Sequence, residues 1–93
     1  MVTLNDVKTA LRITTDEFDT ELSNLMSASL LDLQLSGIVI PDSDNDLINI
    51  AVVTYVKMRF GNPDNYDKLK SSYDEQKGQL SMATGFTVWS KNG

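Results

Sequence analysis

The sequence predicts an all-α protein, a small bundle of about four helices followed by an extended C-terminal tail. Apolar residues recur every three or four positions along most of the 93 residues, which is the spacing of a helix with one buried face. Glycine and proline interrupt this spacing at 37–41 and again at 61–63, and they mark boundaries between elements. We expect helices over approximately residues 3–11, 16–36, 43–60 and 63–80.

The first helix is short and carries its own start signal. Thr3 suits the N-cap position, and Asp6 three residues later completes a pattern resembling a capping box. The apolar residues that then fall on one helix face are Leu4, Val7 and Leu11.

The second helix is the longest expected element. Thr15 or Asp16 can cap it, and the acidic residues within 16–21 lie where the positive end of the helix dipole favours negative charge. Its apolar stripe consists of Phe18, Leu22, Leu25, Met26, Ser29 and Leu33, widened near the end by Leu30, Leu31 and Leu35. Gly37 suits the left-handed position that closes a helix.

The third helix is apolar on nearly every side between Leu47 and Tyr55. Such a helix is either central to a bundle or shared between the core and another subunit. Asp42, Ser43 and Asp44 are its expected caps.

The fourth helix is expected to start at Asn62-Pro63, a cap residue followed by proline at the first helical position. The residues that face one way along it are Tyr66, Leu69, Tyr73 and Leu80. Gly78 costs about 1 kcal/mol inside a helix, so the helix is expected to stop near residue 77 or to weaken there.

The chain divides into a helical domain, residues 1–81, and a tail, residues 82–93, that is either mobile or docked on a partner. The closing TGFTVWSKNG alternates with the period of a strand but is too short to be stable alone. Aromatic residues beyond the last helix mark either a partner site or a tail that folds back over the bundle.

Charge and composition exclude several functions. Eight basic against 13 acidic residues give a net charge of −5, which disfavours binding to nucleic acid. The absence of cysteine and histidine removes disulfides, thiol nucleophiles, common zinc sites and the usual general base. The start MVTLNDVKTA lacks the pattern of a signal peptide, and no apolar run approaches a membrane span, so we expect a soluble protein.

Alternate carboxylates at Asp42, Asp44 and Asp46 resemble the start of a calcium loop. Such a loop needs glycine at its sixth position and glutamate at its twelfth, where this chain has Leu47 and Val53. These acids are better explained as helix caps, and those within 16–21 as a solvated helix start. We expect no catalytic, metal or cofactor site, and hence no enzyme.

Two ordered segments resemble the gp6-like head-tail connector proteins of tailed bacteriophages. The first match, within VKTALRITTDEFDTELSNLMSAS, is carried by Val7, Lys8, Leu11, Arg12, Ile13, Asp16, Asp19, Leu22 and Leu25. The second, within AVVTYVKMRFGNPD and YDEQKGQLS, is carried by Ala51, Tyr55, Val56, Lys57, Phe60, Gly61, Tyr73, Lys77, Leu80 and Ser81. Together they cover most of residues 4–81.

This resemblance implies an all-helical subunit of the virion neck, assembled in the bacterial host cytoplasm. Its subunits would form a ring under the portal protein and offer a platform for the next neck or tail protein. Genomic DNA would pass through the ring without specific binding. The role requires no catalytic residue, and ring neighbours would cover the surplus apolar helix.

The candidate contact residues follow from this reading. Those for the ring are Leu30, Leu31, Leu35, Ile50 and Val53, and those for docking to the portal or the next neck protein are Phe86, Val88 and Trp89. The alternative is a small helical interaction or regulatory module of the helix-turn-helix type. Its best recognition helix would be the third, which is mostly apolar rather than basic.

Overall fold

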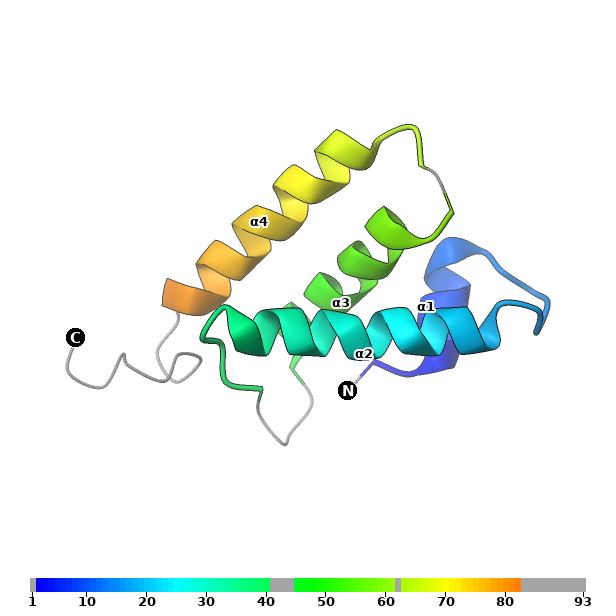
Figure 1. Cartoon of the computed structure of the whole chain (residues 1–93), viewed down its shortest axis with the longest axis horizontal. Coiled ribbons are helices and arrows are strands. Elements are labelled where there is room, and N and C mark those ends of the chain that lie inside the picture. The colour runs from blue at the N-terminus through cyan, green and yellow to red at the C-terminus, as the bar shows by residue number, and fades with distance from the viewer. Residues whose placement is uncertain (1, 41–44, 62, 83–93) are drawn as a thin grey trace.

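The computed structural model describes residues 2–40, 45–61 and 63–82, and these form four α-helices (Figure 1). Their bounds are α1 Leu4–Leu11, α2 Asp19–Leu35, α3 Asp46–Arg59 and α4 Tyr66–Met82. No strand occurs in this described part of the chain, so the predicted all-α class is confirmed.

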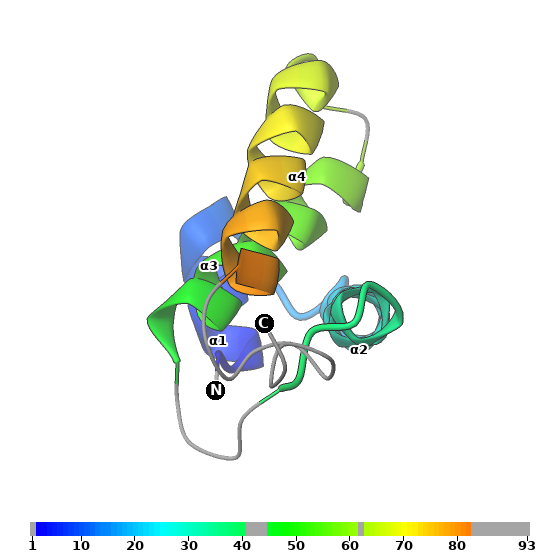
Figure 2. The same ribbon diagram turned by 90° about the vertical axis from the view of Figure 1, so that its left-hand side faces the viewer.

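Helix α3 is the centre of the bundle. It packs against α1, α2 and α4, and α1 also packs against α2. Figure 2 looks along α2 and shows it set to one side of the other three helices. One side of α2 is therefore not covered by any of the other three described helices.

The core is apolar and α3 supplies more of it than any other helix. Its buried members are Val2, Val7, Leu22, Leu33, Ile38, Ile48, Ala51, Val52, Val56, Met58, Tyr73 and Leu80. The apolar stripes predicted for α1, α2 and α4 each place at least one of these residues inside, because helical spacing brings them to the face that meets α3.

Two end signals predicted from the sequence are confirmed. Thr3 and Asp6 form a complete capping box: Thr3 Oγ1 accepts a hydrogen bond from the Asp6 N–H at 3.2 Å, and Asp6 Oδ2 accepts one from the Thr3 N–H at 2.9 Å. Gly37 follows α2 with a φ of +88°, in the left-handed region where glycine carries no steric cost.

The prediction that α2 starts at Thr15 or Asp16 is wrong, because its first residue is Asp19 and Phe18 precedes it without a side-chain cap. Thr15 Oγ1 accepts from the Glu17 N–H at 3.0 Å, within the turn before the helix. Asp16 instead pairs with Lys8 on α1. The ion pair with Lys8 on α1 thus occupies the Asp16 side chain, which the local sequence pattern assigned to the helix cap.

The starts of α3 and α4 also lie later than predicted. The cap of α3 is Asn45, whose side chain accepts from the Ile48 N–H at 3.1 Å, and residues 42–44 lie outside the described part of the chain. Helix α4 starts at Tyr66 rather than at residue 63, because a turn at 64–65 intervenes.

Gly78 neither ends nor interrupts α4, contrary to the prediction, and the helix runs on to Met82. Tyr73 and Leu80 are buried on either side of Gly78. Their packing against α3 outweighs the roughly 1 kcal/mol that glycine costs.

Candidate functional site

The outer side of α3 carries an apolar row that the described part of the chain leaves uncovered. Leu47 and Ile50 are 45% and 50% exposed, and Val53 is partly buried next to them. We call these three residues the α3 ridge. Charged residues occur only at its ends, with Asp46 before it and Lys57 after it. Of the predicted ring contacts on this helix, Ile50 is thus exposed and Val53 half covered.

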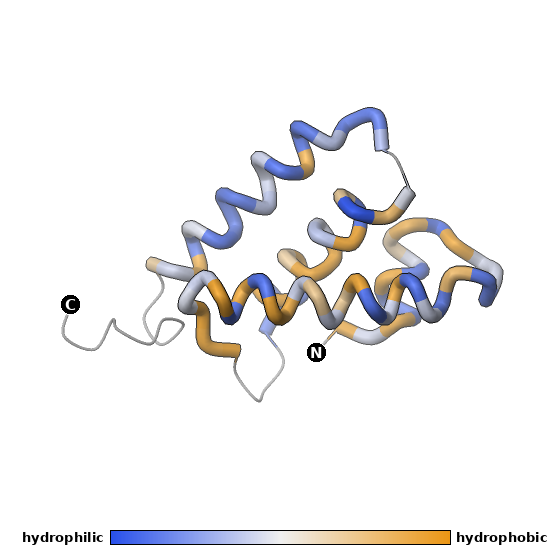
Figure 3. Tube along the Cα trace, viewed as in Figure 1, coloured by the Kyte–Doolittle hydropathy of each residue, from blue (hydrophilic) through white to orange (hydrophobic). Residues whose placement is uncertain are grey.

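The outer side of α2 is also uncovered and is almost free of charge. Leu31 is 56% exposed and Leu35 79% exposed, whereas Leu30 packs against the edge of the core. Leu31 and Leu35 continue a row of residues four apart that begins with Ser23 and Ser27. Helix α2 contains no basic residue at all. Figure 3 shows the mixed hydropathy of α2 beside the largely hydrophilic α4.

The exposed residues of α2 and α3 point in opposite directions. Leu31 lies two residues from Ser29 and from Leu33, both fully buried, and two residues turn the helix by about 200°. Ile50 lies two residues from Val52, which lines a groove together with residues of α2. Leu31 therefore points away from α3, and Ile50 points away from α2. The fold separates these predicted contacts into two surfaces.

An apolar groove of about 390 Å³ opens between α2 and the N-terminal segment. We call it the α2 groove, and its lining residues are Val2, Thr3, Leu4, Ser23, Met26, Ser27, Leu30 and Val52. None of these described lining residues is charged. The Val2 N–H donates to Asn49 Oδ1 at 3.0 Å. This bond holds the N-terminal segment, which forms the side of the groove opposite α2, against α3. Sequence reasoning missed the groove, since only the fold places Val2 beside α2.

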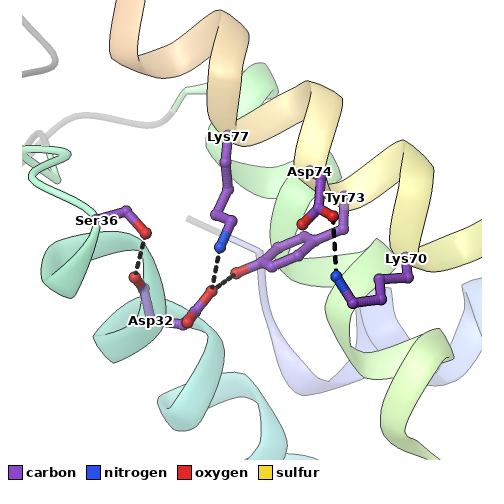
Figure 4. A network of polar contacts seen from close by, with 6 residues as sticks. All are labelled: Asp32, Ser36, Lys70, Tyr73, Asp74 and Lys77. Atoms are coloured by element: carbon purple, nitrogen blue, oxygen red, sulfur yellow. Dashed lines mark hydrogen bonds and ion pairs between the residues drawn. The ribbon is translucent and has the colours of Figure 1, made fainter.

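A polar junction joins α2 to α4 (Figure 4). Tyr73 Oη donates to Asp32 Oδ2 at 2.6 Å, and Lys77 Nζ pairs with the same oxygen at 3.2 Å. The Tyr73 ring meets the Tyr55 ring edge-on, with centroids 5.3 Å apart. Arg59 lies over Tyr55, and Lys77 lies over Tyr73. Tyr73 is thus buried and in contact with side chains of both α2 and α3.

The electrostatics of this junction fit a structural role. Burial, followed by the hydrogen bond to Asp32, raises the pKa of Tyr73, so the phenol stays protonated and does not act as a base. Burial opposes ionisation of Asp32, but bonds from Tyr73 and Lys77 and the charges of Lys77 and Arg59 outweigh it and lower the pKa of Asp32. The carboxylate stays ionised and joins the two helices.

A second ion cluster fixes α1 to the start of α2. Lys8 Nζ lies 2.8 Å from Asp16 Oδ1 and 2.8 Å from Asp19 Oδ1. Hydrogen bonds to these two carboxylates raise the pKa of Lys8, and the bond from Lys8 lowers the pKa of Asp16. Two of the acids at 16–21 are therefore held in ion pairs with Lys8 of α1, Asp16 from the turn before α2 and Asp19 from its first residue.

The described residues contain no group of three or more histidine, cysteine, aspartate or glutamate side chains able to hold a metal ion. Within the same residues, no helix has both the length and the hydropathy needed to cross a bilayer. The predicted docking residues Phe86, Val88 and Trp89 lie outside the described part of the chain.

The model of the phage connector protein family matches residues 3–87. This chain belongs to the phage connector family. The match includes both segments that carry the predicted resemblance and extends past Ser81, and it is to phage connectors in general, so the narrower gp6-like assignment stays a prediction. No curated protein and no solved structure matches the chain.

Family membership gives the connector a structural role in the phage particle, exerted through contacts with other virion proteins. The described fold exposes apolar side chains on α2 and α3, among them Leu31, Leu35, Leu47 and Ile50.

Proposed function

We propose that this connector is a head-tail adaptor that forms a closed ring under the portal and links the DNA-filled head to the next neck or tail protein. The observation that carries the proposal is the pair of uncharged apolar surfaces, around Leu31 and Leu35 and around Ile50 and Val53, that point in opposite directions. A subunit with two different contact surfaces associates head to tail, and such association closes into a ring when its rotation allows.

In this proposal Leu30, Leu31 and Leu35 contact one neighbour, and Ile50 and Val53 contact the other. Phe86, Val88 and Trp89 dock on the portal or on the next neck protein. The net charge of −5 suits a conduit that DNA traverses without being held, since tight binding to phosphates requires basic side chains.

Light scattering of the purified chain across a wide concentration range, alone and with the portal protein of the same phage, tests the ring. We expect a shift from monomer to one large closed species as concentration rises, or on addition of the portal. A chain that remains monomeric under both conditions contradicts the proposal.

Binding of the connector to immobilised portal protein tests the role of the tail. The double substitution Phe86→Ala and Trp89→Ala is expected to weaken portal binding while leaving the size of the oligomer unchanged. Loss of the oligomer with portal binding intact would assign these residues to the ring instead.

A further inference from the structure

Among the described residues, the α2 groove is an open apolar surface, and the α3 ridge of the same chain is also apolar. Ile50 and Val53 of the ridge border a shallow hollow of about 270 Å³, so the two surfaces match in apolar character. Leu47, Ile50 and Val53 are three residues apart, so they form a row along α3 with a rise of about 4.5 Å between neighbours. The α2 side of the groove consists of two rows, and within each row the residues are four positions apart. One row is Ser23 with Ser27, and the other is Met26 with Leu30.

We infer that the α3 ridge of one subunit inserts into the α2 groove of the next. Rows spaced by three residues pack into furrows between rows spaced by four, with helix axes crossing at about 20°. The two serines are small and let the incoming helix approach closely. Leu31 and Leu35, which continue the Ser23–Ser27 row, then extend the contact beyond the groove.

Charge is the reason that the occupant is a second copy of the chain. Each copy carries a net charge of −5, so two copies repel each other on average. The ridge is uncharged between Asp46 and Lys57, and the described lining of the groove contains no charged residue. Contact through these two surfaces avoids the repulsion and buries both apolar areas at once.

This pairing rests on the proposed self-assembly and makes it more specific. The ridge and the groove are different surfaces, so every subunit that gives its ridge to one neighbour still offers its groove to another. The contact therefore propagates, whereas a two-fold contact of like surfaces would stop at a dimer.

Disulfide cross-linking tests the pairing, and it is simple because the chain has no cysteine. The double variant Ser27→Cys with Ile50→Cys is oxidised mildly under the conditions in which light scattering detects the oligomer. We expect a ladder of cross-linked multimers on a denaturing gel from this double variant. The two single variants mixed together should stop at a dimer, and each alone should give none.

The matched control pairs Ile50→Cys with Gln79→Cys, an exposed position on α4, and it should remain monomeric on the gel. A substitution that fills the groove, Ser27→Leu, should abolish the oligomer while the circular dichroism of the monomer stays unchanged. Gln79→Leu, the same kind of enlargement at an exposed position on α4, should leave the oligomer intact.

The outcomes separate the pairing from the ring. A large oligomer that gives no ladder with Ser27→Cys and Ile50→Cys overturns the pairing and leaves the ring standing. Dimers from Ile50→Cys alone would show that two ridges meet each other, which also overturns it. A chain that is monomeric both alone and with the portal overturns the ring and the pairing together.

Discussion

Helices α2 and α4 have the same length, 17 residues, and both pack against α3, yet their outer sides differ in charge. Each exposes large apolar side chains, in α4 only Met82 at its end. Helix α4 contains three acidic and three basic residues and buries only Tyr73 and Leu80. Helix α2 has no basic residue and exposes Leu31 and Leu35. The outer side of α4 is suited to water, and that of α2 is apolar enough for the contact proposed above.

The inner side of α2 contributes to the stability of the fold, whereas the outer side does not. The largest expected effect is therefore a loss of unfolding free energy on truncating an inner residue. Leu33 is fully buried, so Leu33→Ala should lower the free energy of unfolding by about 2–5 kcal/mol. Leu31→Ala should change it by less than about 0.5 kcal/mol. Urea denaturation of dilute monomer measures both. Equal losses would mean that Leu31 belongs to the core.

Charge on the outer side of α2 should break assembly, whereas charge on α4 should not. The double substitution Leu31→Lys and Leu35→Lys places two cations where a neighbour would pack, and association should weaken by at least about tenfold, or about 1.4 kcal/mol. The control on α4 is Ser72→Lys with Gln79→Lys, at two exposed positions. Sedimentation velocity compares them. Loss of assembly only in the α4 control would reverse the assignment of the two sides.

The junction between α2 and α4 should make stability depend on pH. The pKa of Asp32 is lower in the fold than in the unfolded chain, so its contribution is fully present above the ordinary aspartate pKa of about 3.9 and is lost as pH falls through the lowered value. Partial exposure of Asp32 limits the contribution to about 1 kcal/mol or less. When the pH is lowered from about 6 to about 3, the urea midpoint of unfolding should therefore fall further for the wild type than for Asp32→Asn. Equal falls would contradict the role of this carboxylate.

The outer side of α4 should be the least sensitive region. Lys70 and Asp74 form an ion pair at 3.0 Å, but both side chains are about half exposed to water. Lys70→Ala is therefore expected to leave both the urea midpoint and the oligomer size at wild-type values, because solvent screens such pairs. A clear change in oligomer size would show that α4 also contacts a neighbour.

Local patterns predicted the features that depend on a few adjacent residues. The capping box of Thr3 and Asp6 and the closing Gly37 need only their own backbone geometry, and the apolar stripes need only helical spacing. The predicted start of α2 is too early, since Lys8 on α1 pairs with the Asp16 side chain that was expected to cap the helix. The predicted starts of α3 and α4 are too early as well. The break predicted at Gly78 failed for a related reason: packing of Tyr73 and Leu80 outweighs a local propensity.

The candidate contacts show the same division. Sequence reasoning selected Leu30, Leu31, Leu35, Ile50 and Val53 as candidate ring contacts. The fold exposes Leu31, Leu35 and Ile50 and leaves Leu30 and Val53 partly buried. Sequence reasoning did not indicate that the exposed residues would point in opposite directions, or that a groove would lie beside Met26 and Leu30.

The order of residues was enough to fix the helical class, the apolar stripes, the sign of the charge and the lack of cysteine and histidine chemistry, because each depends on composition or short-range spacing. The polar junction at Asp32, the groove against Val2 and the direction of each exposed leucine came from the packing of α1, α2 and α4 around α3. That packing joins residues more than 40 positions apart, as Asp32 joins Tyr73 and Val2 joins Asn49. Geometry between such distant residues has no counterpart in a local pattern.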